Sequence, residues 1–206
     1  MMIRSWWEQR VLPRLVDVVL SDAVSRSWRD LVCAGATGRV LEVGFGSGHN
    51  LPHYPDAVTE VLAVEPADLA WDRARERLEA FHRPVERVGL DGASLPVPSR
   101  SVDTVVSTWT MCTIPHLHSA IEEMHRVLRP DGRLLYVEHV LSTHPQVSTL
   151  QRRVQPLWGP VAGGCHLDRD VEGLLRDGGF TITPLAHPAS DTLSPVPFVA
   201  GVAHPG

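Results

Sequence analysis

A group of glycines near residue 45 has the clearest chemical meaning in the sequence. Residues 40–48 read V-L-E-V-G-F-G-S-G, an apolar run followed by glycine at every second position. Glycine lets the chain turn sharply and lets backbone N–H groups approach a ligand with no Cβ in between. Glu42 stands two residues before the first glycine. This acid suits a positively charged ligand better than a pyrophosphate.

The spacing of the glycines separates this loop from the dinucleotide-binding fingerprint. Gly44, Gly46 and Gly48 follow G-x-G-x-G, and His49 stands where G-x-G-x-x-G has its third glycine. An NAD-linked oxidoreductase is therefore disfavoured. S-adenosylmethionine carries an ammonium and a sulfonium group, so we predict it as the cofactor.

Two more acids follow later strands. Glu65 ends V-L-A-V-E-P, where a carboxylate can accept hydrogen bonds from both ribose hydroxyls. Taken alone, it could also be a solvated strand end. Asp91, in L-D-G-A-S-L-P, could accept from an adenine amino group or form an Asx turn before Gly92.

His139 is the first candidate for a general base, because it ends an apolar run at the ligand-binding edge of the predicted sheet. The alternative is a structural histidine. Methyl transfer from a sulfonium mainly requires alignment of donor and acceptor and exclusion of water. A thiol acceptor needs only to lose its proton, whereas a phenol or carbon acceptor asks more of a base.

The stretch from residue 139 to 169 is long for a simple connection, so we predict a loop that forms the acceptor pocket and its lid. Leu150, Val154, Trp158 and Val161 give it apolar surface. The predicted pocket residues are Trp109, Trp158, Cys165 and His166. Cys112 is interpreted as packing. Adjacent ligands such as Cys165 and His166 do not make a metal site, and none is predicted.

The elements that position these residues follow from hydrophobic periodicity. Predicted strands cover 39–43, 60–65, 85–89, 102–107, 132–138, 179–185 and 196–203. Predicted helices cover 48–54, 67–82, 117–128 and 169–177, the last capped by Asp168, and most of 1–32, split at Pro13 or at Ser21–Asp22. The apolar positions of that first stretch include Trp6, Trp7, Leu12, Leu15, Val19 and Trp28. The alternation predicts a Rossmann-like α/β fold: a mostly parallel sheet with helices on both faces.

Length and composition limit the classes of function. The 206 residues fit one domain, with an N-terminal helical cap over 1–36, a cofactor-binding half over 37–140 and an acceptor side over 141–206. The net charge of −5 gives no attraction to nucleic acid or anionic lipid. The three cysteines fit no disulfide framework, and no signal-peptide or membrane-spanning pattern is present. We expect a cytoplasmic protein with a small-molecule substrate, as a monomer or homodimer.

The order of these motifs resembles the class I S-adenosylmethionine-dependent methyltransferases over most of the chain. E-V-G-F-G-S-G, S-V-D-T-V-V-S-T and V-L-R-P-D-G-R-L-L-Y-V-E-H-V are shared widely there. Together with N-L-P-H-Y-P, the narrower G-G-C-H-L-D-R-D segment is similar to the branch that contains ubiquinone/menaquinone methyltransferases and small thiol methyltransferases.

The resemblance implies a seven-stranded sheet with an antiparallel last strand, and cofactor contacts from the glycine loop, the acids and the loop after Ser107. The predicted cofactor-binding residues are Glu42, Gly44, Phe45, Gly46, Gly48, Asn50, Glu65, Pro66, Asp91, Gly92, Ala93, Ser107 and Thr108. The animal thiol methyltransferases carry an apolar membrane anchor before this domain. This sequence begins with a charge-studded stretch, so a membrane site does not carry over.

The predicted function is methyl transfer from S-adenosylmethionine to a small, rather apolar acceptor, with a thiol favoured. The alternatives are C- or O-methylation of a quinone or phenol, and a non-catalytic binding protein with a methyltransferase fold. A nucleic-acid methyltransferase is disfavoured, because the chain has no basic stripe and no N-P-P-Y-type tetrad after residue 107.

Overall fold

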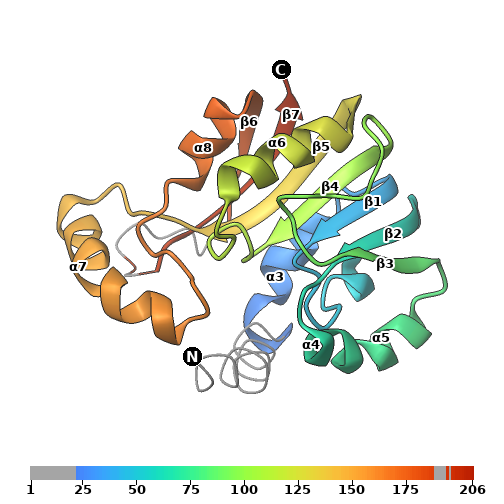
Figure 1. Cartoon of the computed structure of the whole chain (residues 1–206), viewed down its shortest axis with the longest axis horizontal. Helices are drawn as coiled ribbons and strands as arrows, with labels where there is room; N and C mark the ends of the chain where they lie inside the picture. Colours follow the sequence, from blue (N-terminus) through green and yellow to red (C-terminus); the bar gives the residue numbers. More distant parts are fainter. Residues whose placement is uncertain (1–21, 188–193, 195) are drawn as a thin grey trace.

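Seven strands form one sheet in the computed structural model, which describes residues 22–187, 194 and 196–206 (Figure 1). The strands are β1 Gly38–Val43, β2 Val58–Val64, β3 Val85–Gly89, β4 Val102–Thr108, β5 Leu128–His139, β6 Phe180–Leu185 and β7 Phe198–Pro205. Their order is β3-β2-β1-β4-β5-β7-β6. The first five run parallel, and β7 is antiparallel to both β5 and β6. The predicted fold class is confirmed.

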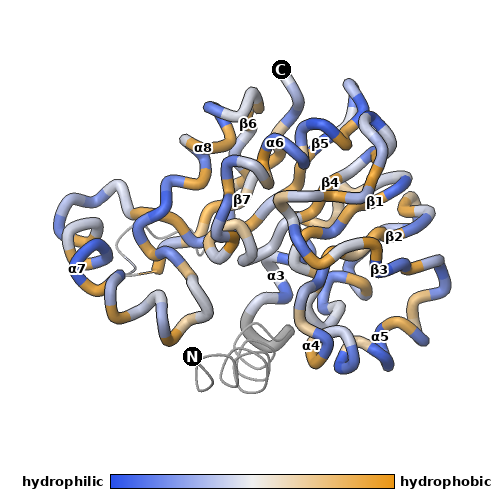
Figure 2. The backbone as a smooth tube through the Cα atoms, viewed as in Figure 1, coloured by the Kyte–Doolittle hydropathy of each residue, from blue (hydrophilic) through white to orange (hydrophobic). Residues whose placement is uncertain are grey.

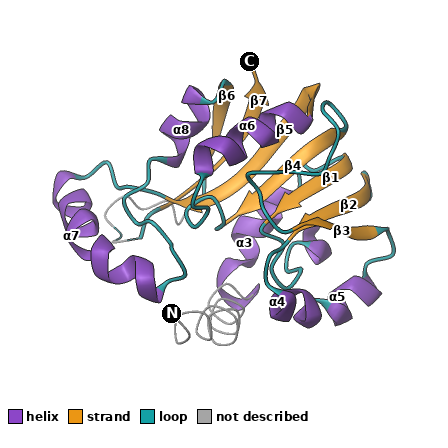
Figure 3. Ribbon diagram, in the orientation of Figure 1, coloured by secondary structure: helices purple, strands orange, loops and turns teal. Residues whose placement is uncertain are grey.

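Helices cover both faces of this sheet, as Figure 3 shows. They are α3 Asp22–Cys33, α4 Asp68–Arg73, α5 Arg75–Ala80, α6 Leu117–Val127, α7 Pro145–Val161 and α8 Val171–Asp177. One buried cluster joins α6 and α8 to the sheet, and a second joins α3 and α4 to the opposite face. Strands with apolar residues on both faces fit between these layers (Figure 2).

The first predicted helical stretch is described only in part. Within it, α3 packs on the sheet, and the Trp28 side chain is buried in the second cluster. Trp6, Trp7, Leu12, Leu15, Val19 and the proposed break at Pro13 lie outside the described residues.

Three predicted helices differ from the observed ones. The helix expected over 48–54 is a single 3-10 turn, Leu51–His53, after Gly48 at a φ of +76°. The helix expected over 67–82 is two short helices, which meet at Ala74. The last helix begins at residue 171, so its cap is Asp170, which accepts from the Gly173 N–H, and not Asp168.

The predicted lid loop is largely helical, so the loop prediction was wrong. Helix α7 spans 17 residues and lies beyond the end of the sheet (Figure 1). Gln151 ties it to the end of β5, because its amide accepts from Ser142 N and donates to the Val140 carbonyl. Two prolines, Pro156 and Pro160, lie inside the helix.

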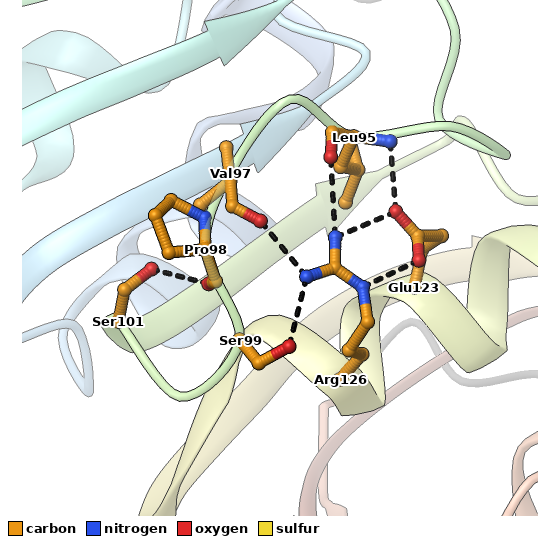
Figure 4. A network of polar contacts seen from close by, with 7 residues as sticks. All are labelled: Leu95, Val97, Pro98, Ser99, Ser101, Glu123 and Arg126. Atoms are coloured by element: carbon orange, nitrogen blue, oxygen red, sulfur yellow. Dashed lines mark hydrogen bonds and ion pairs between the residues drawn. The ribbon is translucent and has the colours of Figure 1, made fainter.

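The loop after β3 is held against α6 by one arginine (Figure 4). Arg126 donates to the carbonyls of Leu95 and Val97, and it pairs with Glu123, which accepts from Leu95 N. These contacts fix the loop that carries Asp91. Among the described residues, no helix combines the length and apolar character that a membrane span needs.

Candidate active site

The carboxyl ends of β1, β2, β4 and β5 meet at one edge of the sheet, because these strands are parallel neighbours. Ligands of open α/β sheets bind at this edge. The glycine loop follows β1, Glu65 follows β2, and Trp109 follows β4. Topology alone therefore brings the residues predicted from separate motifs to one place.

The glycine loop is built as its sequence indicates. Gly44 and Gly46 have φ angles of +78° and +59°, a region that disfavours other residues. A Cβ on Gly44 would collide with the Thr110 side chain. At Gly46, in contrast, no atom of the described residues lies within 4 Å of an ideal Cβ position. The loop therefore has open space beside its backbone, which fits the approach of the predicted cofactor.

Glu65 is held next to this space. Its two carboxylate oxygens accept from Gly46 N and from Ala67 N, each at 2.7 Å. Burial raises the pKa of Glu65, and the two N–H donors oppose that shift. Each oxygen keeps a second lone pair. The carboxylate thus binds the glycine loop itself while retaining the capacity to accept from hydroxyl groups.

Glu42 belongs to a buried polar network behind the loop. Its carboxylate accepts from Asn50 Nδ2 at 2.9 Å and from the Tyr54 hydroxyl at 2.6 Å. Burial raises its pKa to about 7, against the effect of these two bonds. Asn50 also donates to Thr108 Oγ1 and accepts from Arg29 Nε of α3. The network joins β1, β4 and α3 beneath the predicted cofactor site.

The other predicted cofactor residues lie around the same edge. Asp91 forms an Asx turn with Ala93 N at 2.8 Å and is exposed. A Cβ on Gly92 would lie 3.1 Å from Val43. Phe45 is buried and stacks at a tilt on Trp71, with centroids 5.2 Å apart. Pro66 follows Glu65 in the same turn.

On the acceptor side, one carboxylate holds the loop after β4. Glu138, fully buried in β5, accepts from the backbone N–H groups of Thr110, Met111 and Cys112, at 2.8, 2.9 and 3.3 Å. It also accepts from Ser107 Oγ. Burial raises its pKa, and the backbone donors oppose this. Glu138 therefore fixes where the Cys112 side chain lies.

Trp109 has an unusual backbone at the start of that loop. Its φ is +51°, which is strained for a large side chain, and such outliers cluster at functional sites. The indole is buried, packs edge-on against Phe198 at 6.0 Å, and has the Arg29 guanidinium 5.0 Å from its ring centroid. Its Nε1 has no hydrogen-bond partner among the described residues.

His139 lies in a cluster with two cysteines. Its Nε2 is 2.7 Å from Cys165 Sγ, and the sulfurs of Cys165 and Cys112 are 4.0 Å apart. The hydrogen bond with Cys112 lowers the pKa of Cys165, and contacts from His139 and Trp158 act in the same direction. Burial would lower the pKa of His139, but Cys165 and Glu138 raise it. His139 Nδ1 has no partner in the described part of the chain.

The other two predicted pocket residues flank this cluster. Trp158 on α7 is 38% exposed, and its proximity helps to lower the pKa of Cys165. His166 is half exposed, with Nδ1 3.8 Å from Asp168, and does not join the cluster. The interpretation of Cys112 as mere packing missed its place beside Cys165.

Several supporting residues were not singled out from the sequence. Glu138 had a local signal, a charged residue within an apolar strand. Gln155 and Arg169 had none, because their roles depend on contacts far along the chain. Gln155 binds the backbone on both sides of His166, at Cys165 O and Leu167 N. Arg169 donates to the carbonyls of Met111 and Ile114.

Known proteins resemble this chain in sequence and in fold. A family described as "Methyltransferase domain" matches residues 41–136. The human thiol S-methyltransferase TMT1A is 32% identical over 75% of this chain and 65% of its own length. A phosphatidylethanolamine N-methyltransferase from Cereibacter sphaeroides is 30% identical over 68% of each chain.

The similarity covers only part of some relatives. The matched region spans between 55% and 65% of the length of the rat and human thiol S-methyltransferases. Among solved structures, the YcgJ protein from Bacillus subtilis superposes with a TM-score of 0.69 over 87% of this chain and 97% of that one. The sequence identity of that pair is 16%, so the likeness concerns the fold.

Proposed function

Because this chain belongs to the S-adenosylmethionine-dependent methyltransferases, we propose that it methylates a small, rather apolar acceptor, with a thiol favoured over a quinone or phenol. The proposal rests on one observation: the glycine loop and the cluster of two cysteines and a histidine lie at the same edge of the sheet. The open glycine loop follows β1, and the buried cysteines and histidine lie beside the ends of β4, which neighbours β1, and of β5, the next strand in the sheet.

The residues on the cofactor side bind and orient S-adenosylmethionine. The glycine loop and the carboxylate of Glu65 would hold S-adenosylmethionine at its amino-acid and ribose portions, and Asp91 would accept from its adenine. Glu42 and Asn50 keep the loop rigid from beneath. Bound S-adenosylmethionine supplies an electrophilic methyl group on a sulfonium.

The acceptor side aligns the acceptor and excludes water. Trp109 and the ring of His139 are buried at the ends of β4 and β5, which gives an acceptor sulfur an environment with few water molecules. We infer that His139 acts on the acceptor together with Cys165, because its Nε2 contacts Cys165 Sγ. The names of the thiol S-methyltransferase relatives agree with this acceptor class.

Calorimetry tests the cofactor half of the proposal. Glu65→Ala removes an acceptor of two hydroxyl hydrogen bonds, so S-adenosylmethionine binding should weaken by about 2–4 kcal/mol, or ~30–1,000-fold. Glu86→Ala removes an exposed carboxylate from the neighbouring strand β3 and should leave the affinity unchanged. Equal affinity of wild type and Glu65→Ala would place Glu65 outside the site.

A methylation screen tests the acceptor half. Thiols, phenols and quinones are offered with cofactor labelled in its methyl group, and the labelled products are separated. Small apolar thiols should give the highest rate. A higher rate for a phenol or quinone would contradict the proposed thiol acceptor, and the protein would still be a methyltransferase.

A further inference from the structure

We propose that Cys112, His139 and Cys165 form a zinc site with three protein ligands and one open coordination position, and that the acceptor thiol binds there as a thiolate. The metal site is inferred from this chain's own side chains. The role of the open position rests on the proposed function.

The three ligand atoms already lie close together. All are within 4.8 Å of one another, although they come from the loop after β4, the end of β5 and the loop after α7. The sulfurs are 4.0 Å apart. A tetrahedral zinc with Zn–S bonds of about 2.3 Å holds two sulfurs about 3.8 Å apart. The Nε2–Sγ separation must open from 2.7 Å to about 3.5 Å for the same geometry, by a small rotation of either side chain.

Both cysteine loops are fixed by bonds to their backbones. Glu138 accepts from the N–H of Cys112 and its two predecessors, and Gln155 binds the carbonyl of Cys165. The His166 N–H donates to the Cys112 carbonyl at 2.9 Å and so joins one loop to the other. Sites held in this way by surrounding hydrogen bonds keep their geometry without the ligand.

The charges around the cluster favour a divalent cation. Two thiolates and a neutral imidazole around Zn²⁺ make a neutral group, which removes the cost of burying two thiols that repel when ionised. Glu138 and Arg169, which interact electrostatically with the cluster, carry opposite charges.

The donor set selects the type of metal. Two sulfurs and one imidazole suit zinc, and a three-ligand Cys₂His set with a free fourth position is typical of catalytic rather than structural zinc. All three ligand residues are buried, with exposures of 2% for Cys112, 6% for His139 and 8% for Cys165.

Coordination at the open position would convert the acceptor thiol to a thiolate, which is the nucleophilic form. On coordination, R–SH loses its proton to solvent and its sulfur becomes a bound thiolate. A lone pair of that sulfur forms the new bond to the methyl carbon, the bond from that carbon to the cofactor sulfur breaks, and the electron pair stays on the cofactor sulfur. The product is a neutral thioether, a weaker ligand than a thiolate, so it leaves the metal.

Zinc content is the first test. Reduced protein is incubated with zinc chloride, freed of unbound metal by gel filtration and analysed by elemental mass spectrometry. Wild type should retain about one equivalent, and Cys112→Ser and Cys165→Ser should retain at least tenfold less. Cys33→Ser is the matched control, because Cys33 is also fully buried but lies in α3, outside the cluster. It should retain the wild-type content.

Cobalt substitution keeps the test independent of how a serine variant folds. Co²⁺ bound by thiolates in a tetrahedral site gives a near-ultraviolet charge-transfer band and visible bands, which zinc should displace. Cys165→His offers another zinc ligand in place of the thiol and should recover metal binding with a weaker charge-transfer band. Metal-free wild type, equal zinc in all variants, or a disulfide between Cys112 and Cys165 in the protein as isolated would each overturn the site.

Removal of zinc separates this inference from the proposed function. A strong chelator should lower thiol methylation at least tenfold and leave S-adenosylmethionine affinity unchanged. Full thiol methylation by zinc-free protein overturns the role of the open position and leaves the proposed thiol methyltransferase intact. If the protein binds zinc but methylates only acceptors other than thiols, the metal site is confirmed and its role in thiol activation is wrong.

Discussion

The two sides of the candidate site hold their polar groups in opposite ways. Beneath the glycine loop, Glu42, Asn50, Tyr54 and Arg29 share hydrogen bonds among several side chains. On the acceptor side, one carboxylate, Glu138, accepts from three backbone N–H groups and a hydroxyl. Loss of Glu138 removes the acceptor of three backbone N–H groups at once, whereas loss of Glu42 removes the acceptor of two side-chain donors, one of which, Asn50, has further partners. The acceptor side should therefore be the more sensitive to a single substitution.

The largest effect is expected at Glu138. Glu138→Ala leaves three backbone N–H groups without their acceptor in a buried place, which should lower the free energy of unfolding by about 4 kcal/mol. Glu138→Gln can still accept on one oxygen and should cost about half as much. Urea denaturation measures both changes.

Ser107→Ala provides the control for that comparison. It removes one donor to the same carboxylate and should cost only about 1 kcal/mol. If Glu138→Ala cost no more than Ser107→Ala, the loop would be held by other contacts and the contrast between the two sides would be lost.

The second effect concerns pH and the cofactor side. The pKa of Glu42 is about 7 in the folded protein, above its ordinary value of 4.5. The folded state therefore binds the proton more tightly, and this stabilisation is present at low pH and lost as pH rises between these two values. Wild type should lose up to about 3 kcal/mol over that range through this residue, at ~1.4 kcal/mol per pKa unit.

Glu42→Gln isolates this contribution. It has no proton to lose and can still meet Asn50 and Tyr54, so its stability relative to wild type should rise from pH 4.5 to about 7 and then level off. Glu79→Gln, an exposed carboxylate on α5, should show no such trend. A flat difference between Glu42→Gln and wild type would mean that Glu42 is ionised throughout and that the network is charged.

The smallest effect is expected on α7. Leu157 is 77% exposed, so Leu157→Ser should change the unfolding free energy by less than about 0.5 kcal/mol. Leu175→Ala on the buried face of α8 should cost about 2–5 kcal/mol. Thermal unfolding compares the two. A cost above 1 kcal/mol for Leu157→Ser would show that α7 packs as part of the core.

The positions of the glycine loop and of Glu65 at one edge of the sheet could be predicted because their signals are local. Gly44, Gly46 and Glu65 are read from spacing within one strand–loop–strand unit, and all five parallel strands were found by their apolar runs. The helix boundaries were harder. Asp168 and Asp170 are both plausible caps in sequence, and only the packing of α8 decides that Asp170 accepts from Gly173 N.

The acceptor side could not be predicted in the same way, because its contacts join distant positions. Cys112 and Cys165 are 53 residues apart, and nothing in either local sequence indicates the other. Helix α7 was also missed, since Pro156 and Pro160 argue against a helix while tertiary contacts through Gln151 and Gln155 favour it.

Pro156 and Pro160 also affect how easily helix α7 opens. Each lacks the N–H that would bond to the carbonyl four residues earlier, so the second half of the helix is short of internal bonds and little of it is buried. Amide protons there should exchange with solvent through local opening long before those of the central strands. Gln155, which binds the loop of Cys165, lies in the same turns. We therefore expect local opening of α7 to loosen the hold on the Cys165 loop while the sheet stays folded.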